Sequence, residues 1–529
     1  MEKKSKRTPI TIITIIVLIC ALISTYFFLF DDDDKTVNIA STHDVIEYFN
    51  TTGLTDYYNK KLGININWIE YDDGQDAYLQ IKGEYGKDSA SMPDAYLGFN
   101  ISDAQLQIIG PSMFLDMTSY IASDTERFRV IMSSEEFASQ IRSGNSVYSF
   151  PSLYDDYSGR YPQKVWVNKE WLEAVGADMP ATPEQFYELL VKFKNDDPNG
   201  NGQADEIALG CAYKGIAYSG FGFIINAYCQ TSYDLSDRGS ILSLDRDGTV
   251  YSEVTSEGFK TALKYINRLV AEGLVSADVF ENDRAYLAEV GYGEKYGVIV
   301  CSDIYTLFGK DMERASAYIP MPPLNGHVAA TAVKNPQINI GGFMIASESK
   351  HIAALMKMGD MMLSQEGTLT LLYGEKGIGW NDADEAGAMG GSTAVWVTNR
   401  KENLAGNALV KSKVPMWYSS DIILGQQANT DKDGVADLQT EANWQGYLNK
   451  VTRDVYEPIG AETSRYILPE HVVSGSQEDA IRSYINSTCR DFVLGNSSID
   501  ENWDSYVNAL DEKGIGGVIG MMQNTYNSR

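Results

Sequence analysis

A short acidic loop carries the clearest pattern for chemistry in this chain of 529 residues. Oxygen-bearing side chains alternate along residues 197–206, and glycines among them permit a tight turn. A hard cation such as Ca²⁺ gathers six or more oxygen ligands, which one loop of this kind can supply. The expected ligands are the side chains of Asp197, Asn199, Asn201, Asp205 and Glu206 and the backbone carbonyl of Gln203.

This loop departs from an EF-hand, because Ala208 occupies the twelfth position and the last carboxylate, Glu206, comes early. A polar turn without a metal is the alternative. Residues 429–437 repeat the spacing but end without a closing carboxylate, so they are a second candidate Ca²⁺ site that the sequence leaves open. The Asp-Gly pair at 247–248, between apolar runs, instead predicts a hairpin turn.

Motifs of common enzymes are absent. The chain has no GxSxG, HExxH, P-loop or GxGxxG sequence, and its four histidines are scattered. The adjacent Asp155 and Asp156 could serve glycoside hydrolysis, but among 72 acidic residues such neighbours arise by chance. The sequence therefore predicts a protein that is not an enzyme.

The charge balance excludes another class of function. The chain carries 43 Lys+Arg against 72 Asp+Glu, a net charge of −29, and its one basic cluster is at the N-terminus. Nucleic acid is therefore a poor candidate partner. The 33 tyrosines suit a polar, ring-shaped ligand, because their rings combine a flat face with a polar edge, and surface and core packing is the alternative account of their number.

The N-terminus predicts a membrane address. Residues 9–30 lack charge, and at ~1.5 Å per residue they are long enough to cross a bilayer. Basic residues precede this segment and Asp31 to Asp34 follow it, so the rest of the chain should face the exterior. Lipid on Cys20 is the alternative anchor, although Ile19 is bulkier than the small residue that lipoprotein signals carry there.

The other four cysteines have no metal-binding spacing, so we expect free buried thiols, with a Cys211–Cys229 disulfide as the alternative.

Short β-rich runs alternate with amphipathic helical stretches, which is typical of α/β layers. Predicted strands are 36–40, 64–71, 94–99, 147–151, 164–168, 296–301 and 343–346. Thr182 followed by Pro183 and Gln185 predicts a helix start, and Ser256 and Gly273 bound a second helix.

Several segments, in this order, resemble extracellular solute-binding proteins of the carbohydrate ABC-import type, family 1, especially the large lipoprotein members. They are VWVNKEWLEAVG (165–176), PATPEQF (180–186), DPNGNGQADEI (197–207), and residues 262–274, 364–374 and 503–507. The resemblance covers about residues 37–526.

The resemblance implies a two-lobed, periplasmic-binding-protein-like α/β fold with a hinge and an interlobe cleft, preceded by one N-terminal transmembrane or signal helix. It places lobe one at 35–153 plus 341–378 and lobe two at 154–340 plus 379–529, after an N-terminal segment of residues 1–34.

It also implies a sugar in the cleft, held by rings that stack on its CH faces and by polar groups that bind its hydroxyls. Isolated aromatic residues can instead be core. The implied contacts are Phe99, Asn100, Tyr154, Asp156, Arg160, Tyr213, Tyr218, Asp303, Tyr305, Trp380, Trp417 and Tyr418.

The function that the resemblance implies is that of an extracytoplasmic, monomeric binding subunit that delivers a carbohydrate, expected to be an oligosaccharide, to an ABC permease. Two alternatives belong to other classes. One is a surface glycan-active enzyme, either a hydrolase or a lyase, and the other is a glycan- or peptide-binding sensor without a role in transport.

Overall fold

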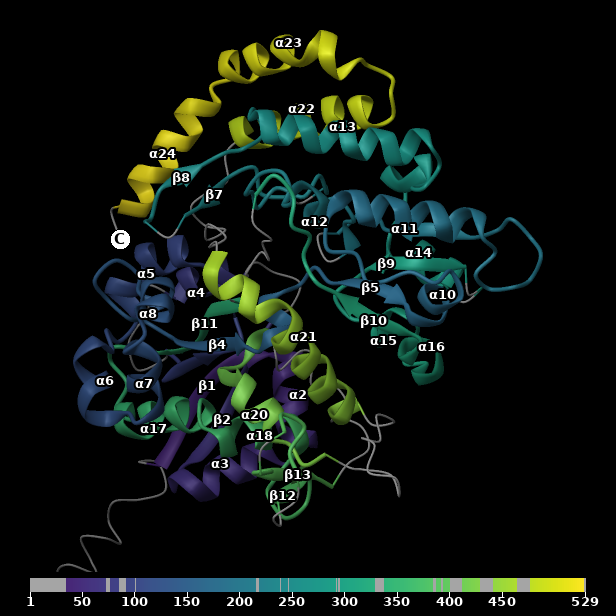
Figure 1. The fold of residues 1–529 in the computed structure, drawn as a ribbon. Helices are drawn as coiled ribbons and strands as arrows, with labels where there is room; N and C mark the ends of the chain where they lie inside the picture. Colours follow the sequence, from purple (N-terminus) through teal and green to yellow (C-terminus); the bar gives the residue numbers. More distant parts are fainter. Residues whose placement is uncertain are drawn as a thin grey trace, which may run out of the picture.

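Two sheets of unequal size organise the chain into two lobes (Figure 1). The computed structural model describes residues 35–72, 77–84, 92–99, 101–215, 218–237, 239–245, 247–291, 293, 295–328, 337–383, 387–391, 393–399, 412–428, 441–463 and 476–527. The predicted α/β class is confirmed. Within these ranges no helix is long and apolar enough to span a bilayer. The predicted N-terminal anchor lies outside the described residues.

The first lobe is built on a six-stranded sheet in the order β14-β4-β11-β3-β1-β2, in which β11 alone runs antiparallel to its neighbours. Its strands are β1 (Thr36–Thr42), β2 (Asn65–Tyr71), β3 (Ala95–Leu97), β4 (Phe150–Asp155), β11 (Gln337–Ile345) and β14 (Met416–Ser419). The predicted strands at 36–40 and 64–71 are confirmed as β1 and β2.

Helices cover both faces of this sheet (Figure 1). They are α2 (His43–Thr51), α3 (Leu54–Leu62), α4 (Ala77–Glu84), α5 (Asp103–Met113), α6 (Thr118–Asp124), α7 (Arg127–Met132), α8 (Glu135–Ile141), α17 (Ile352–Met362), α18 (Gln365–Tyr373) and α20 (Ser420–Leu424). A two-stranded ribbon of β12 (Trp380–Asp382) and β13 (Trp396–Thr398) joins them.

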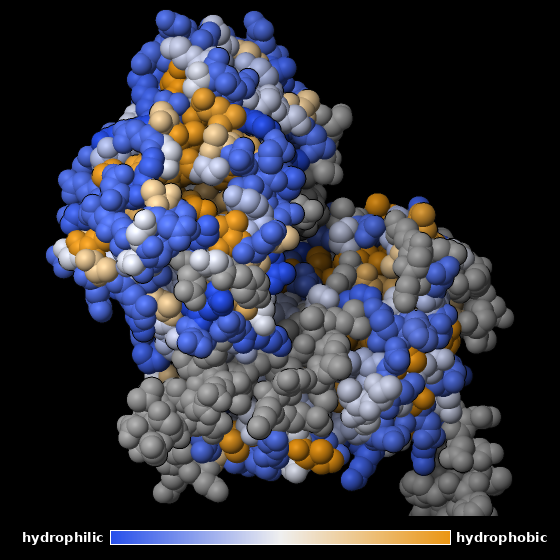
Figure 2. Space-filling view, turned by 90° about the vertical axis from the view of Figure 1, so that its right-hand side faces the viewer, coloured by the Kyte–Doolittle hydropathy of each residue, from blue (hydrophilic) through white to orange (hydrophobic). Residues whose placement is uncertain are grey.

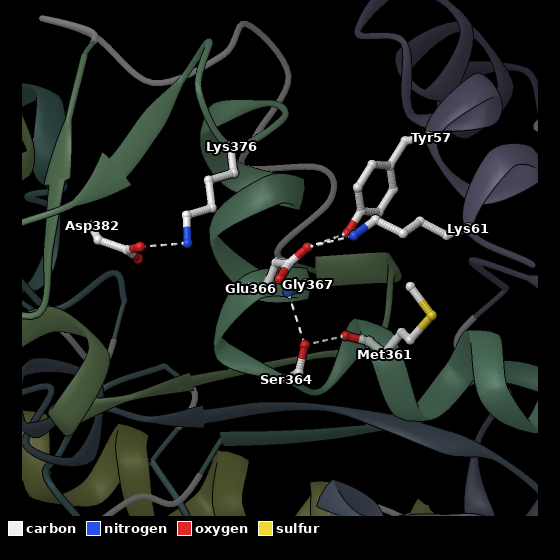
Figure 3. Close-up of polar contacts among 8 residues, drawn as sticks. All are labelled: Tyr57, Lys61, Met361, Ser364, Glu366, Gly367, Lys376 and Asp382. Carbon is white, nitrogen blue, oxygen red and sulfur yellow. Dashed lines mark hydrogen bonds and ion pairs between the residues drawn. The ribbon is translucent and has the colours of Figure 1, made fainter.

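Polar contacts fix α18 in place (Figure 3). Ser364 Oγ accepts from the Gly367 N–H at 2.9 Å and so caps the helix, while its hydroxyl donates to the Met361 carbonyl at 2.7 Å. Glu366 accepts from Tyr57 and Lys61 of α3, both at 3.0 Å. The Lys61 hydrogen bond is the main reason that the pKa of Glu366 is lowered. This part of the resembling segment 364–374 therefore joins two helices of the first lobe.

The second lobe is built on a four-stranded sheet in the order β10-β5-β9-β6. Its strands are β5 (Val165–Asn168), β6 (Ile207–Gly210), β9 (Tyr296–Val300) and β10 (Tyr318–Met321). The short hairpin of β7 (Ser243–Leu244) and β8 (Val250–Tyr251) confirms the turn predicted at Asp247–Gly248.

Two long helices of this lobe begin where the sequence predicts. Thr182 accepts from the Gln185 N–H at the start of α11 (Pro183–Asn195), and Ser256 accepts from the Phe259 N–H at the start of α13 (Glu257–Ala271). The other helices are α9 (Tyr157–Arg160), α10 (Lys169–Ala174), α12 (Gly222–Ile225), η4 (Ala277–Phe280), α14 (Arg284–Gly291), α15 (Ile304–Leu307), α16 (Met312–Ser316), α21 (Glu441–Thr463), α22 (Ser476–Val493), α23 (Ile499–Glu512) and α24 (Ile515–Asn527).

Among the described elements the chain passes from one lobe to the other three times, between β4 and β5, between β10 and β11, and between α20 and α21. One segment differs from the division expected from the sequence, which assigned all of 379–529 to lobe two. β14 pairs with β4 in the first-lobe sheet, and Trp380, Trp396 and Ile422 are buried in the same core. The reason is that β4 needs a neighbour on its outer side, and residues 416–419 supply it.

Cys211, Cys229, Cys301 and Cys489 are free and buried, as expected, so the alternative Cys211–Cys229 disulfide is not formed.

Candidate functional site

The carboxyl ends of the parallel strands locate the candidate site. In open α/β sheets, ligands bind beyond these ends. The first crossing leaves the first lobe from the end of β4, and in the second lobe the end of β9 lies beside the start of β5, where Val300 pairs with Val165. The loops that follow these strands therefore meet at the lobe boundary. Figure 2 shows a recess in the surface between the two lobes, bordered by polar and apolar side chains.

The first-lobe cluster consists of Tyr154, Trp417, Tyr418 and Thr368. Tyr154 and Tyr418 are paired across β4 and β14, with ring centroids 6.2 Å apart. Thr368 Oγ1 accepts from the Trp417 N–H at 3.2 Å. The Trp417 indole N–H is buried and has no hydrogen-bond partner among the described residues. Burial and, after it, the Asp156 charge raise the pKa of the Tyr154 hydroxyl. The structure thus places three predicted contacts at one sheet end, with Tyr154 and Tyr418 on one face and Trp417, the preceding residue of β14, on the other.

The second-lobe cluster consists of Asp303, Tyr305, Trp444, Tyr218 and Arg284. Asp303 follows β9 and caps α15, accepting from the N–H groups of Tyr305 and Thr306 at 3.0 and 3.3 Å. It also accepts from the Thr306 hydroxyl at 2.6 Å and from the Trp444 indole N–H at 2.8 Å.

Aromatic packing completes this cluster. The Tyr305 and Trp444 rings lie 5.1 Å apart, and Tyr218 packs against the same core. Arg284 donates to the Thr306 carbonyl at 2.8 Å. Three of these residues were predicted, whereas Trp444 and Arg284 were missed. Trp444 is 141 residues from Asp303, so no local signal could have indicated it.

Two predicted contacts lie in the first crossing. Asp156 is buried and accepts from the Gly159 N–H at 3.0 Å, so it caps α9. Arg160 lies 3.7 Å from Glu457 of α21 and 5.4 Å from the centroid of the Tyr157 ring. Both are therefore engaged in fixing this segment.

The remaining predicted contacts belong to neither cluster. Phe99 is buried against Tyr71, with centroids 5.5 Å apart, and Tyr213 packs on Phe280 at 5.5 Å. Trp380 is only 2% exposed in the first-lobe core. Asn100 lies outside the described residues. Rings that follow a strand end can turn inward as easily as outward, and local sequence does not distinguish the two.

The sequence pattern did not predict an ion pair beside the end of β1. Lys413 Nζ lies 2.6 Å from Asp44 Oδ2, and both side chains are about one-third exposed. Partial burial works to raise the pKa of Asp44, but hydrogen bonds from Lys413 and Thr42 outweigh it and lower the pKa. This pair places two charged, partly accessible groups at the sheet edge that faces the lobe boundary.

The candidate cation loop has the predicted turn. Asp197, Gly200 and Gly202 adopt positive φ values of 47°, 66° and 71°. Asp197 accepts from the N–H groups of Asn201 and Gly202 at 3.1 and 3.0 Å, and Asn199 accepts from Asn201 N–H at 3.0 Å. The side-chain oxygens therefore turn toward the backbone of their own loop.

The two carboxylates at the end of the loop differ in their partners. Asp205 accepts from Asn201 Nδ2 at 3.1 Å and pairs with Lys295 at 2.9 Å, and these contacts lower its pKa. One carboxylate oxygen of Glu206 is buried without a hydrogen-bond partner among the described residues. No three His, Cys, Asp or Glu side chains gather as a metal site in the described ranges. Residues 429–437, the second candidate, lie outside those ranges.

Comparison with known proteins gives sequence relatives for nearly the whole chain. No family model matches. The fructooligosaccharide ABC transporter substrate-binding protein FusA of Streptococcus pneumoniae is 24% identical in an alignment of 512 positions that covers 88% of this chain and 85% of FusA. The lipoprotein LipO of Bacillus subtilis is 29% identical over 135 residues, a quarter of each chain.

Solved structures share the fold. An HMO-binding, ABC-transporter-associated solute-binding protein of Bifidobacterium longum infantis has a TM-score of 0.69 at 18% identity, covering 93% of this chain and 98% of that one. A FusA EF-hand mutant in complex with fructo-nystose has a TM-score of 0.60 at 19% identity, covering 93% and 99%. The chain is therefore similar, along most of its length and in its fold, to substrate-binding proteins of ABC transporters.

Proposed function

We propose that this protein is the extracytoplasmic binding subunit of an ABC importer and that it captures an oligosaccharide between its lobes. The observation that carries the proposal is the pair of aromatic and polar clusters, one on each lobe, at sheet ends that meet at the lobe boundary. The alignment with FusA, which is named for fructooligosaccharides and is covered over 85% of its length, supports this ligand class. A guest that touches both lobes can drive their closure.

The two clusters suit different parts of a sugar. Trp417, which is partly exposed, offers a ring face for its CH groups, and its unpartnered indole N–H can donate to a hydroxyl. Tyr418 is only 6% exposed and packs behind Tyr154. On the opposite lobe Tyr218 offers a partly exposed ring, Tyr305, only 6% exposed, packs in the core of the cluster, and Asp303 and Arg284 lie beside them. The Asp44–Lys413 pair can bind hydroxyls at the edge of the site. No bond of the sugar is broken, and the guest passes to the permease unchanged.

Isothermal titration with kestose, nystose, other oligosaccharides and monosaccharides tests this function. We expect saturable binding of an oligosaccharide, weaker binding of its monosaccharides, and no new reducing ends after prolonged incubation. Release of reducing ends would favour the glycan-active enzyme. Binding of peptides but of no glycan would favour a sensor.

We further propose that residues 197–206 bind Ca²⁺, with Asp197, Asn199, Asn201, Asp205 and Glu206 as side-chain ligands and Gln203 as a carbonyl ligand. The unpartnered Glu206 oxygen and the inward-turned Asp197 support this set. Ca²⁺ would hold the loop closed, and Asp205 would exchange its Lys295 contact for the metal.

Calcium titration of EDTA-treated protein, read by calorimetry and thermal melting, tests this site. We expect Asp197→Ala to abolish the rise in melting temperature, whereas Asp245→Ala in the hairpin retains it. An absence of any Ca²⁺ response in the unaltered protein would leave this loop a plain polar turn.

We also propose that residues 9–30 remain as a membrane anchor beside the permease and that the protein acts as a monomer. The acidic Asp31 to Asp34 that follow support an exterior location of the lobes. Membrane fractionation of Cys20→Ser tests the anchor. Retention in the membrane supports the helix, and release supports lipid on Cys20.

A further inference from the structure

The first crossing ends at a completely buried lysine. Lys164 is 0% exposed, and its ammonium donates to the carbonyls of Tyr161 and Ser158 at 2.7 and 2.9 Å and to Ser158 Oγ at 3.3 Å. A buried ammonium is costly unless its three donors find acceptors. All three acceptors lie on α9 or directly after it, so Lys164 folds residues 156–164 back on themselves.

Helix α21 fastens the same segment from another side. The Ser158 N–H donates to Asn449 at 3.2 Å, and the Tyr161 hydroxyl donates to Glu457 at 2.7 Å. Tyr456 then joins two strands of the second lobe, because its hydroxyl accepts from Val165 N–H at 3.1 Å and donates to the Met321 carbonyl at 2.9 Å. The end of the first crossing and the start of the second are therefore tied to one helix.

Along the backbone the attachment to the first lobe is much shorter, and α21 also reaches that lobe, where Arg453 donates to the Gly390 carbonyl at 3.4 Å. Asp155 is the last residue of β4 in register with β14, opposite Ser419. The next residue, Asp156, already caps α9. The change from first-lobe sheet to second-lobe segment therefore takes place across one peptide junction.

Lys164 is also placed between two predicted ligand contacts. The carboxylates whose charges act on its ammonium are Asp156 in the crossing and Asp303 in the second-lobe cluster. Strand β5 begins directly after it, and the Cys301 N–H donates to the Lys164 carbonyl at 3.0 Å, which fixes its position two residues from Asp303. A substitution at Lys164 should therefore affect both the first crossing and the second-lobe cluster.

We propose that Lys164 is a positioning residue that makes residues 156–164 one rigid unit with α21, so that bending of the first crossing concentrates at the 155–156 junction. The inference rests on the proposed function in one respect, namely that the lobes close on a ligand. The local rigidity and the lobe motion that it governs are properties of the ligand-free protein.

Lys164→Met tests this role, with Lys169→Met as the matched control on the partly exposed start of α10. Hydrogen exchange of the Gly159, Arg160 and Tyr161 amides reports on the crossing, and exchange in β9 reports on global unfolding. Spin labels at Ile108 and Met521, which are 63% and 56% exposed, report the distribution of interlobe distances without ligand.

We expect Lys164→Met to speed exchange of the three amides at least tenfold relative to β9 and to broaden the distance distribution. Lys169→Met should match the unaltered protein in both measurements. Unchanged exchange, or faster exchange with an unchanged distance distribution, would overturn the proposal.

If Lys164→Met does not fold, Asn449→Ala removes the acceptor of the Ser158 N–H instead. We expect faster exchange of the three amides and a broader distance distribution, both smaller than in Lys164→Met. The absence of these changes would likewise overturn the proposal. Because no sugar is added, a failure here is separate from a failure of the binding experiment.

Discussion

The two clusters at the lobe boundary differ in how many hydrogen bonds their polar groups already make. Asp303 accepts hydrogen bonds from two backbone N–H groups, a hydroxyl and the Trp444 indole. In the first lobe, by contrast, the Trp417 indole N–H is buried without a partner among the described residues. A saturated group acts mainly as scaffold, whereas a buried donor without a partner is available to a guest.

This difference gives an experimental rule. Substitutions in the second-lobe cluster should appear mainly as lost stability, and those in the first-lobe cluster mainly as lost affinity. The following experiments examine that contrast.

Asp303→Ala should have the largest effect. It removes the cap of α15 and leaves the buried Trp444 indole N–H unpaired, so we expect the free energy of unfolding to fall by about 2–4 kcal/mol. Urea denaturation measures this loss. Asp303→Asn keeps an acceptor oxygen, so its free energy of unfolding should fall by less than half as much. If Asp303→Ala unfolds like the unaltered protein but binds no sugar, the assignment of Asp303 to the scaffold is wrong.

Asp234 tests how much a buried carboxylate lowers the free energy of unfolding. Burial raises its pKa to about 6, although Ser236 hydrogen bonds work to lower it. Between pH 4 and pH 6 the folded state then holds a proton that the unfolded state has released, so this group's contribution to stability falls as pH rises through that window.

Asp234→Asn should therefore raise the free energy of unfolding at pH 7.5 by about 2 kcal/mol and flatten its dependence between pH 4 and pH 6. The Gln163 side chain, which donates to Asp234 at 2.7 Å, must turn its amide to accept from the new Asn. Urea denaturation across this pH range is the measurement. An unchanged pH profile would show that Asp234 is not the responsible group.

Trp417→Ala should lower oligosaccharide affinity at least tenfold, about 1.4 kcal/mol, because it removes both a ring face and the unpartnered donor. Trp417→Phe keeps a ring and should recover part of the loss. Titration calorimetry measures both variants. Equal affinity of Trp417→Ala and the unaltered protein would remove Trp417 from the site.

Lys413→Met should have the smallest effect. A pair of charges that is about one-third exposed contributes about 0.5–1 kcal/mol, so a modest loss of stability is expected in thermal melts at low salt. The difference should shrink as salt is added, because salt screens the pair. A loss that persists at high salt would point to packing of the Lys413 stem instead.

Local sequence was sufficient for elements that depend on near neighbours. β1, β2, β5 and β9 follow from short apolar runs, and the starts of α11 and α13 follow from Thr182 and Ser256. The hairpin at Asp247–Gly248 likewise follows from neighbouring residues in the sequence.

Features that join distant segments were not predictable in this way. β14 pairs with a strand more than 260 positions earlier, and Lys413 meets Asp44 across 369 positions. The role of Asp303 as a saturated cap depends on Trp444 of α21, which only the folded chain brings to it. Position after a strand indicates that a residue lies at the right edge, but not which way its side chain turns.

The late arrival of β14 has a consequence for biogenesis. A chain that is exported from its N-terminus presents β4 long before residue 416 has followed. Throughout that interval β4 is an edge with open backbone donors and acceptors, the kind of surface on which nascent chains aggregate. Slowing export between residues 155 and 419 should therefore make the newly made protein dependent on folding helpers, whereas a pause after residue 424 should not.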